Sequence, residues 1–143
     1  MPKFKTLLFL TLIFTSCNQK IEPVKHNYHE IKDSLIPWSD VFVQEDVSYY
    51  VYFYSELCGH CSDIKQDVIS FYLKEEYVLY FVCTDYEKVI GPKKDLTGID
   101  NIDNFYIFGT PFMVFIEDHI VSEYYAGSGE ILELISILEN NYS

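Results

Sequence analysis

The run Val47 to Tyr54, Val-Ser-Tyr-Tyr-Val-Tyr-Phe-Tyr, constrains the fold of this chain more than any other segment. Nearly every residue in it is β-branched or aromatic, so the strand that it predicts has no polar face. A strand of this kind is covered on both sides, as at the centre of a sheet flanked by helices. The run therefore predicts a layered domain with this strand in its interior.

The spacing of apolar residues changes directly after this run. An apolar stripe at helical spacing predicts a helix from Gly59 to about Glu75. The stripe consists of Ile64, Val68, Phe71 and Tyr72. Tyr77 to Thr84 is a second apolar run and predicts another buried strand. A strand, a helix and a strand in this order form a unit with a right-handed crossover and parallel strands.

The C-terminal part of the chain predicts a hairpin and a helix. Phe112 to Glu117 and Ile120 to Ala126 read as antiparallel strands joined tightly at Asp118-His119. Gly127 ends the hairpin, and Ser128 is expected to cap a final helix. The apolar face of that helix consists of Ile131, Leu134, Ile135 and Leu138.

The remaining segments carry weaker signals. Trp38 to Glu45 predicts a short helix, with Ser39 or Asp40 as its cap. Asp85 to Asn101 is interrupted by glycine and proline and predicts a loop with a helical fragment. A further short helix is expected from Asn101 to Tyr106.

The N-terminus reads as an export signal. Lys3 and Lys5 precede an apolar stretch of about nine residues, Thr6 to Phe14. This stretch is shorter than the roughly twenty residues that span a bilayer. Thr15-Ser16-Cys17 follows it and resembles the lipobox of bacterial lipoproteins, although Phe14 replaces the usual Leu. We expect lipid attachment at Cys17; the alternative is an ordinary secretory signal with an incidental cysteine.

These features divide the chain into three parts. Residues 1–16 are expected to be the signal peptide, 17–33 a polar tether, and 34–143 one folded domain. We expect His26 and His29, which lie in the predicted tether, to be exposed rather than to bind a metal. The domain is expected to be a monomer on the outer face of the cytoplasmic membrane, or secreted or periplasmic if it carries no lipid.

The charge of the chain excludes some partners. The net charge is −12, and removal of residues 1–16 would take away two lysines and no acid, which leaves −14. So acidic a protein is not expected to bind nucleic acid. Its surface would also be repelled by anionic lipid, so a covalent anchor is the better explanation for membrane attachment.

Cys58-Gly59-His60-Cys61 places two thiols three positions apart at the start of the predicted helix. Such a pair can form, break and exchange a disulfide. Two alternatives remain: an inert structural disulfide, or half of a zinc site. Structural zinc needs about four ligands, and the sequence has no second pair at suitable spacing. Cys83 lies in a predicted buried strand and is expected to be a small core residue.

The order of elements, the Cys-x-x-Cys at the first strand-to-helix junction and Thr110-Pro111 before the hairpin resemble the thioredoxin superfamily. The resemblance covers about residues 38 to 143. It implies a thioredoxin-like α/β fold with a central mixed sheet flanked by helices. Gly59-His60 between the cysteines is similar to the Cys-Gly-His-Cys of protein disulfide isomerases.

The resemblance also implies roles for these residues. Cys58, at the N-terminus of the helix, is the nucleophile with a lowered pKa. Cys61 resolves the mixed disulfide, and His60 favours the thiolate and so makes the disulfide more oxidising. Thr110-Pro111 corresponds to a cis-proline whose preceding backbone binds the substrate. No dissociable cofactor and no metal are needed.

Three residues depart from the superfamily pattern. Tyr52 stands where a buried carboxylate often lies beneath the cysteines. Leu57 replaces the common tryptophan before the first cysteine, and Gln66 replaces the usual proline of the helix. The loss of the carboxylate leaves open how Cys61 loses its proton.

The sequence therefore predicts an exported thiol:disulfide oxidoreductase that acts on cysteines of other proteins. Gly59-His60 favours an oxidase or isomerase, whereas similar tethered lipoproteins often act as reductases supplied by a separate redox partner. A rival from another class is a non-catalytic peptide-binding module that serves as an accessory of a secretion system.

Overall fold

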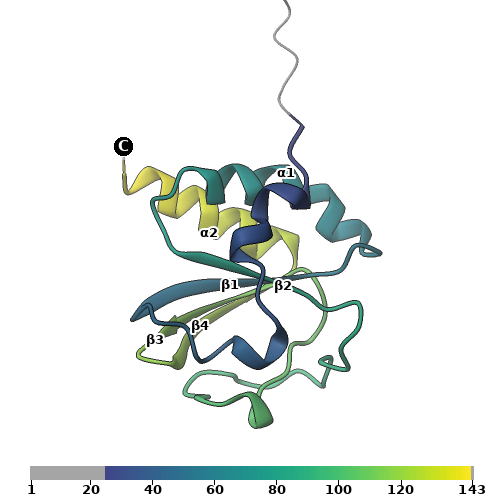
Figure 1. The fold of residues 1–143 in the computed structure, drawn as a ribbon, viewed down its shortest axis with the longest axis vertical. Coiled ribbons are helices and arrows are strands. Elements are labelled where there is room, and N and C mark those ends of the chain that lie inside the picture. The colour runs from purple at the N-terminus through teal and green to yellow at the C-terminus, as the bar shows by residue number, and fades with distance from the viewer. Residues whose placement is uncertain (1–24, 143) are drawn as a thin grey trace, which may run out of the picture.

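The computed structural model describes residues 25–142, which form a four-stranded sheet with two α-helices on one side (Figure 1). The predicted signal peptide, Cys17 and the first part of the tether lie outside these residues. The strands are β1 (Ser48–Tyr54), β2 (Leu79–Cys83), β3 (Phe112–Glu117) and β4 (Ile120–Ala126). The α-helices are α1 (Gly59–Leu73) and α2 (Ser128–Asn140), and the 3-10 helices are η1 (Tyr28–Ser34), η2 (Trp38–Asp40) and η3 (Ile102–Asn104).

The sheet is mixed, with strand order β2-β1-β3-β4. The long apolar run forms β1, which lies inside the sheet as predicted. β1 is parallel to β2 and antiparallel to β3, and β3 forms an antiparallel hairpin with β4. Asp118 and His119 make the hairpin turn with φ angles of 49° and 65°. The predicted strand pairings and fold class are therefore confirmed.

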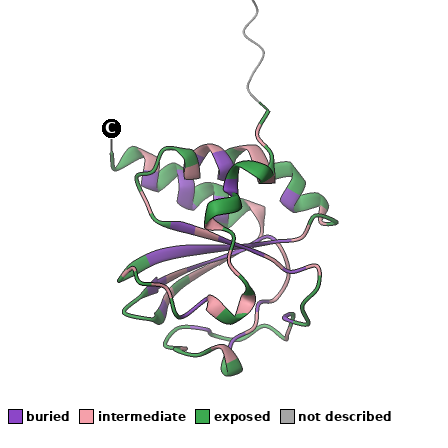
Figure 2. Ribbon diagram, viewed as in Figure 1, coloured by how far each residue is buried: buried purple, intermediate pink, exposed green. Residues whose placement is uncertain are grey.

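Both sides of the sheet are buried, but they are covered differently (Figures 1 and 2). We call the side under α1, α2 and η1 the helical face and the opposite side the loop face. Alternate residues of β1 point to each. The helical face receives Tyr50, Tyr52 and Tyr54. The loop face receives Tyr49, Val51 and Phe53, under η2 and the segment between β2 and β3.

Several predicted helix boundaries are corrected by the structure. The helix predicted over 38–45 is only the three-residue η2, and its N-cap is Pro37, without a side-chain cap. Neither predicted cap holds that position: Ser39 and Asp40 lie inside η2, and the Ser39 hydroxyl donates to the Asp40 carboxylate at 2.8 Å. Residues 85–101 form turns and one isolated bridge, Ile90 to Ile107, with no helix. The helix predicted over 101–106 is the short η3, which Asn101 caps.

The start of α2 also differs from the prediction. Its N-cap is Gly127, at φ 87°, and not Ser128. A side chain at this φ would be strained, which explains the glycine. The Ser128 hydroxyl instead donates a hydrogen bond to the carbonyl of His60 at 3.3 Å and so joins the two helix N-termini.

The predicted tether is wrong over its last residues, because residues 26–33 pack on the domain. η1 begins with a capping box, in which Asn27 accepts from His29 N–H and Glu30 accepts from Asn27 N–H. Its Ile31 side chain is fully buried on the helical face. Gln66 of α1 bonds both the N–H and the carbonyl of His26, at 2.6 and 2.7 Å. The folded body therefore begins before residue 34.

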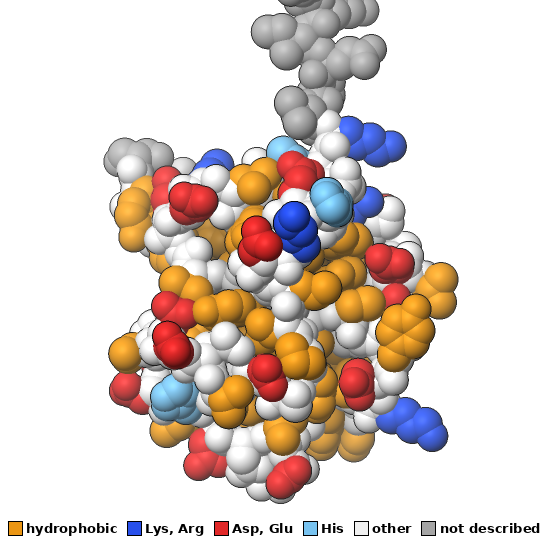
Figure 3. Space-filling view, viewed as in Figure 1, with side chains coloured by type: hydrophobic (Ala, Val, Ile, Leu, Met, Phe, Trp, Pro, Cys, Tyr) orange, Lys and Arg blue, Asp and Glu red, His pale blue; other side chains and the backbone are white. Residues whose placement is uncertain are grey.

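The surface is acidic without one dominant acidic patch on the side that Figure 3 shows, where red side chains are scattered among orange and white ones. Such a distribution suits solubility. Within residues 25–142, no helix has the length and apolar character needed to cross a bilayer.

Candidate active site

Cys58 is the N-cap of α1, as predicted, and its sulfur faces the free amides of the first turn. Its Sγ accepts a hydrogen bond from the N–H of Cys61 at 3.1 Å. A tight turn after β1 sets this position, with Cys58 N–H donating to the Ser55 carbonyl at 3.2 Å. The thiol is partly exposed, so a substrate can reach it.

The pKa of Cys58 is lowered, although partial burial by itself would raise it. Hydrogen bonds from the Cys61 thiol and the Thr110 side chain, and then from the N–H groups of Cys61 and His60, outweigh that burial. Each of these donors stabilises the thiolate more than the thiol. In the protonated state the Cys58 thiol donates instead to the Thr110 carbonyl, at 3.3 Å.

Cys61 lies one turn further into α1 and is fully buried. Burial, followed by its hydrogen bond to Cys58, raises the pKa of this thiol to about 11. The two sulfurs thus have opposite properties: one is accessible and easily ionised, the other enclosed and protonated. Accessibility and a lowered pKa are the properties of a reactive thiol, and of these two thiols only Cys58 has them.

Thr110 and Pro111 lie against the cysteines, although about fifty residues separate them in the sequence. The peptide bond between them is cis, as predicted. A shallow groove of about 280 Å³ begins at this bond. It is lined by Phe108, Gly109, Thr110, Pro111, Phe112, Ala126 and Gly127.

His60 and Gly59 contribute less than the sequence suggests. The His60 ring is 81% exposed and lies 3.8 Å from the carboxylate of Asp63. Within residues 25–142, no hydrogen bond joins this ring to the Cys58 sulfur, and His60 acts on Cys58 through its backbone N–H. A Cβ added at Gly59 would meet no atom within 4 Å, so space does not require glycine there.

A second hollow of about 370 Å³ opens on the other side of Cys58. Its walls include Tyr28 and His29 of η1, together with Glu56 and Lys65. The Tyr28 ring stacks on Tyr54, with centroids 4.0 Å apart. Sequence analysis missed this contribution because the segment was assigned to the tether. The capping box of Asn27 and Glu30, followed by Ile31, is the signal that predicts η1.

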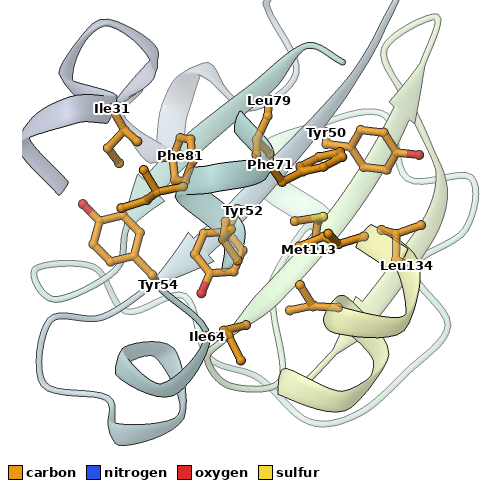
Figure 4. Close-up of a cluster of buried hydrophobic side chains, with 14 of the residues drawn as sticks. Ile31, Tyr50, Tyr52, Tyr54, Ile64, Phe71, Leu79, Phe81, Met113 and Leu134 are labelled. Atoms are coloured by element: carbon orange, nitrogen blue, oxygen red, sulfur yellow. The ribbon is translucent and has the colours of Figure 1, made fainter. Parts of the chain in front are cut away.

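Tyr52 occupies the position beneath the cysteines where the superfamily resemblance led us to look for a carboxylate. It lies in the middle of the helical-face cluster, among Tyr54, Ile64 and Phe81 (Figure 4). Its side chain is fully buried, and its hydroxyl has no hydrogen-bond partner among residues 25–142. Tyr28 has the only other such buried side-chain group in that range.

Cys83, at the end of β2, stands apart from the other two thiols. It is partly buried, packs against the helical-face cluster and donates to Asp85 at 3.4 Å. Burial raises its pKa, so it is a poor nucleophile. Among the described residues no group of three or more His, Cys, Asp or Glu side chains is placed to hold a metal.

Comparison with solved structures gives matches to thioredoxins. Thioredoxin f2 of Chlamydomonas reinhardtii superposes with a TM-score of 0.50 over 75% of this chain and 94% of that one, at 13% identity. The chain has a thioredoxin-like fold. Mitochondrial thioredoxin 3 of Saccharomyces cerevisiae, in its oxidised form, gives 0.50 over 78% and 97% of the two chains, at 12% identity. No protein-family model and no curated protein sequence matches the chain.

Proposed function

We propose that this chain is a thiol:disulfide oxidoreductase that exchanges disulfides with cysteines of other proteins. The observation that carries the proposal is the pairing of a partly exposed Cys58, whose pKa is lowered, with a buried Cys61 that hydrogen-bonds it. A structural disulfide would not need one thiol to be activated and accessible. The thioredoxin-like fold supports the assignment.

The reaction has two steps in the direction that reduces a substrate. The Cys58 thiolate attacks one sulfur of the substrate disulfide, forms a mixed disulfide and releases the other substrate sulfur as a thiolate. Cys61 then loses its proton and attacks the Cys58 sulfur. The Cys58–Cys61 disulfide forms, the second substrate thiolate leaves, and two electrons have passed to the substrate. Oxidation of a substrate is the reverse sequence.

The surroundings of Cys58 suit an extended polypeptide as the substrate. The Thr110 carbonyl already faces Cys58, and the groove beside Pro111 continues from it. Leu57, directly before Cys58, is 92% exposed and offers an apolar contact at the rim. Backbone pairing at Thr110 and apolar contact at Leu57 are the features by which a peptide segment would bind.

One equilibrium measurement tests both the activity and its direction. The full chain with Cys17→Ser and Cys83→Ser is equilibrated in glutathione buffers, and the Cys58–Cys61 disulfide is quantified. We expect exchange, and Cys61→Ser in this background should trap a mixed disulfide. A potential near that of thioredoxin, about −270 mV, favours the reductase direction; one near that of protein disulfide isomerase, about −180 mV, favours an oxidase or isomerase. Absence of exchange and trapping would contradict the enzyme and favour the peptide-binding module.

We further propose that the protein works outside the cytoplasm, anchored by a lipid on Cys17. The support is the sequence alone: a basic and apolar N-terminus that ends in Thr15-Ser16-Cys17. Expression in a bacterial host should give a form that partitions into detergent. The Cys17→Ala variant should lose this behaviour, and retention of it would contradict the anchor.

A further inference from the structure

Cys61 presents a proton-transfer problem that the two cysteines do not solve. It is fully buried, yet it must lose its proton to attack the mixed disulfide. The groups that act most strongly on it are Cys58, Ser55 and Thr110, and none of these is a carboxylate. A thiol in this environment needs a route by which the proton reaches solvent.

Two tyrosine hydroxyls of the helical face are unusual in being buried without a partner. Among residues 25–142, those of Tyr28 and Tyr52 are the buried side-chain polar groups that lack a hydrogen bond. Leaving such a group unpaired destabilises the folded protein. Two in one cluster therefore point to a shared function or a shared water molecule.

Packing places these two tyrosines in the same cluster as Cys61. Tyr52 and Cys61 belong to the same buried cluster, and Tyr28 packs against it. The Tyr54 ring lies parallel to both tyrosines, 4.0 Å from the Tyr28 ring and 6.2 Å from the Tyr52 ring. After burial, a negative charge on Cys61 is the strongest influence that raises the pKa of each of these two groups. Both hydroxyls therefore lie within electrostatic reach of the resolving thiol.

Tyr28 also connects this interior to the outside. It lines the hollow of about 370 Å³ beside Cys58. Glu56 and His29 line the same hollow. η1 is clamped there by the two hydrogen bonds between Gln66 and His26.

We propose that the Tyr52 and Tyr28 hydroxyls, with a water molecule held between them, form a relay that carries the Cys61 proton to the hollow beside Cys58. The proposal rests on the proposed oxidoreductase function and assigns these tyrosines as relay residues. As Cys61 attacks Cys58, its proton enters the relay. Each oxygen accepts one proton and releases another, so a proton reaches water in the hollow and neither tyrosine becomes charged. The substrate thiolate leaves with the electron pair of the broken bond.

The raised pKa values of Tyr28 and Tyr52 agree with such a relay. Hydroxyls that resist ionisation do not act as free bases, but they can transfer protons in a concerted way. η1 therefore supplies part of the active site as well as covering the helical face.

The test follows the reactions of the two cysteine sulfurs as two successive steps. The full chain with Cys17→Ser and Cys83→Ser is reduced and mixed with an aromatic disulfide that releases a coloured thiolate at each step. The first release reports attack by Cys58, and the second reports attack by Cys61. Tyr52→Phe and Tyr28→Phe keep both rings and remove only the hydroxyls. We expect each to slow the second release by roughly 10- to 100-fold and to leave the first unchanged.

Tyr50→Phe is the matched control, because Tyr50 lies on the same strand and the same face as Tyr52. It should leave both releases unchanged. The relay variants should also lose the solvent isotope effect on the second release and shift its pH profile to higher pH. A packing defect alone would change neither.

Two results would overturn the relay: a second release that is unaffected in the Tyr28→Phe/Tyr52→Phe double variant, or equal slowing by Tyr50→Phe. Failure of the proposed oxidoreductase function would give a different result from failure of the relay. In that case the unsubstituted tyrosine background would itself release only one thiolate or none.

Discussion

The two faces of the sheet both carry a buried cluster but differ in chemistry. On the loop face the Tyr49 hydroxyl donates to the Val41 carbonyl at 2.8 Å, so this buried polar group is satisfied. On the helical face the Tyr52 hydroxyl has no partner within residues 25–142. The two tyrosines are fully or almost fully buried residues of one strand, three positions apart. All three cysteines of the described range also belong to the helical face.

This contrast indicates that packing alone determines which residues occupy the loop face. On the helical face, the chemistry of the thiols also determines them. The loop face is completed by stacked rings, such as Phe105 against Trp38 with centroids 5.2 Å apart. The helical face retains an unpaired hydroxyl, which costs stability, and an enclosed thiol. Substitutions in the loop-face core away from the groove at Pro111 should therefore change stability alone, and removal of polar groups around Cys61 on the helical face should change reactivity.

The largest expected effect is the loss of exchange in Cys58→Ser. The hydroxyl of serine is not ionised at neutral pH, so neither a mixed disulfide nor an internal disulfide can form at this position. Exchange with oxidised glutathione, followed by mass spectrometry, should fall to background at residue 58. Cys83→Ser should exchange normally through the remaining pair. Substantial turnover by Cys58→Ser would show that another residue is the nucleophile.

The second effect is a wide difference between the pKa values of the two thiols. The lowered pKa of Cys58 means more thiolate at neutral pH, so alkylation there should be faster than for an ordinary thiol. With a pKa of about 11, Cys61 is a thiolate in only about one molecule in ten thousand at pH 7. Alkylation of the reduced protein across pH, read by peptide mass, should show Cys58 reacting first and Cys61 only in strong alkali. Equal rates would contradict the division of roles.

The third effect tests the loop face. Phe105 packs against Trp38, Phe42 and Phe53, so Phe105→Ala should lower the free energy of unfolding by about 3–5 kcal/mol. Urea unfolding measures this loss. The pKa of Cys58 should stay unchanged, and Phe105→Leu serves as the milder variant if alanine prevents folding. A shift of that pKa in either variant would show that the two faces are coupled.

A smaller effect is expected at the clamp on η1. Gln66→Ala removes two hydrogen bonds to His26 and should cost about 1–2 kcal/mol. Hydrogen exchange should rise over residues 26–34. Gln44→Ala is the matched control, since Gln44 makes one hydrogen bond to the Asp40 carbonyl on the loop face. Unchanged exchange over η1 would mean that Gln66 does not hold it.

The smallest effect is expected for His60→Ala. The ring is exposed and pairs with Asp63, while the backbone N–H that stabilises Cys58 is kept. The thiolate absorbance of Cys58 should therefore shift its midpoint by less than about 0.5 pH unit. A rise of this midpoint by one pH unit or more would support the tuning role of His60 that the Cys-Gly-His-Cys resemblance implies.

Local patterns predicted the regular elements well. β3 and β4 have the predicted bounds, and the stripe of α2 is buried at all four predicted positions. Predictions for short segments failed where side chains had competing partners. Ser128 was expected to cap α2, but its hydroxyl bonds the distant His60 carbonyl. Residues 25–33 resembled a tether because their one fully buried side chain, Ile31, gives no periodic signal.

The sequence by itself determined the β-α-β order, the hairpin, and the placement of Cys58 at a helix N-terminus, because these depend on residues close together in the chain. Only the tertiary structure decided the surroundings of the thiols. It brought Thr110 to Cys58, turned the His60 ring to solvent, and clamped η1 beside the site through Gln66. It also enclosed the Tyr28 and Tyr52 hydroxyls without a partner within residues 25–142. Burial and hydrogen bonding depend on contacts between distant segments, which spacing along the chain does not encode.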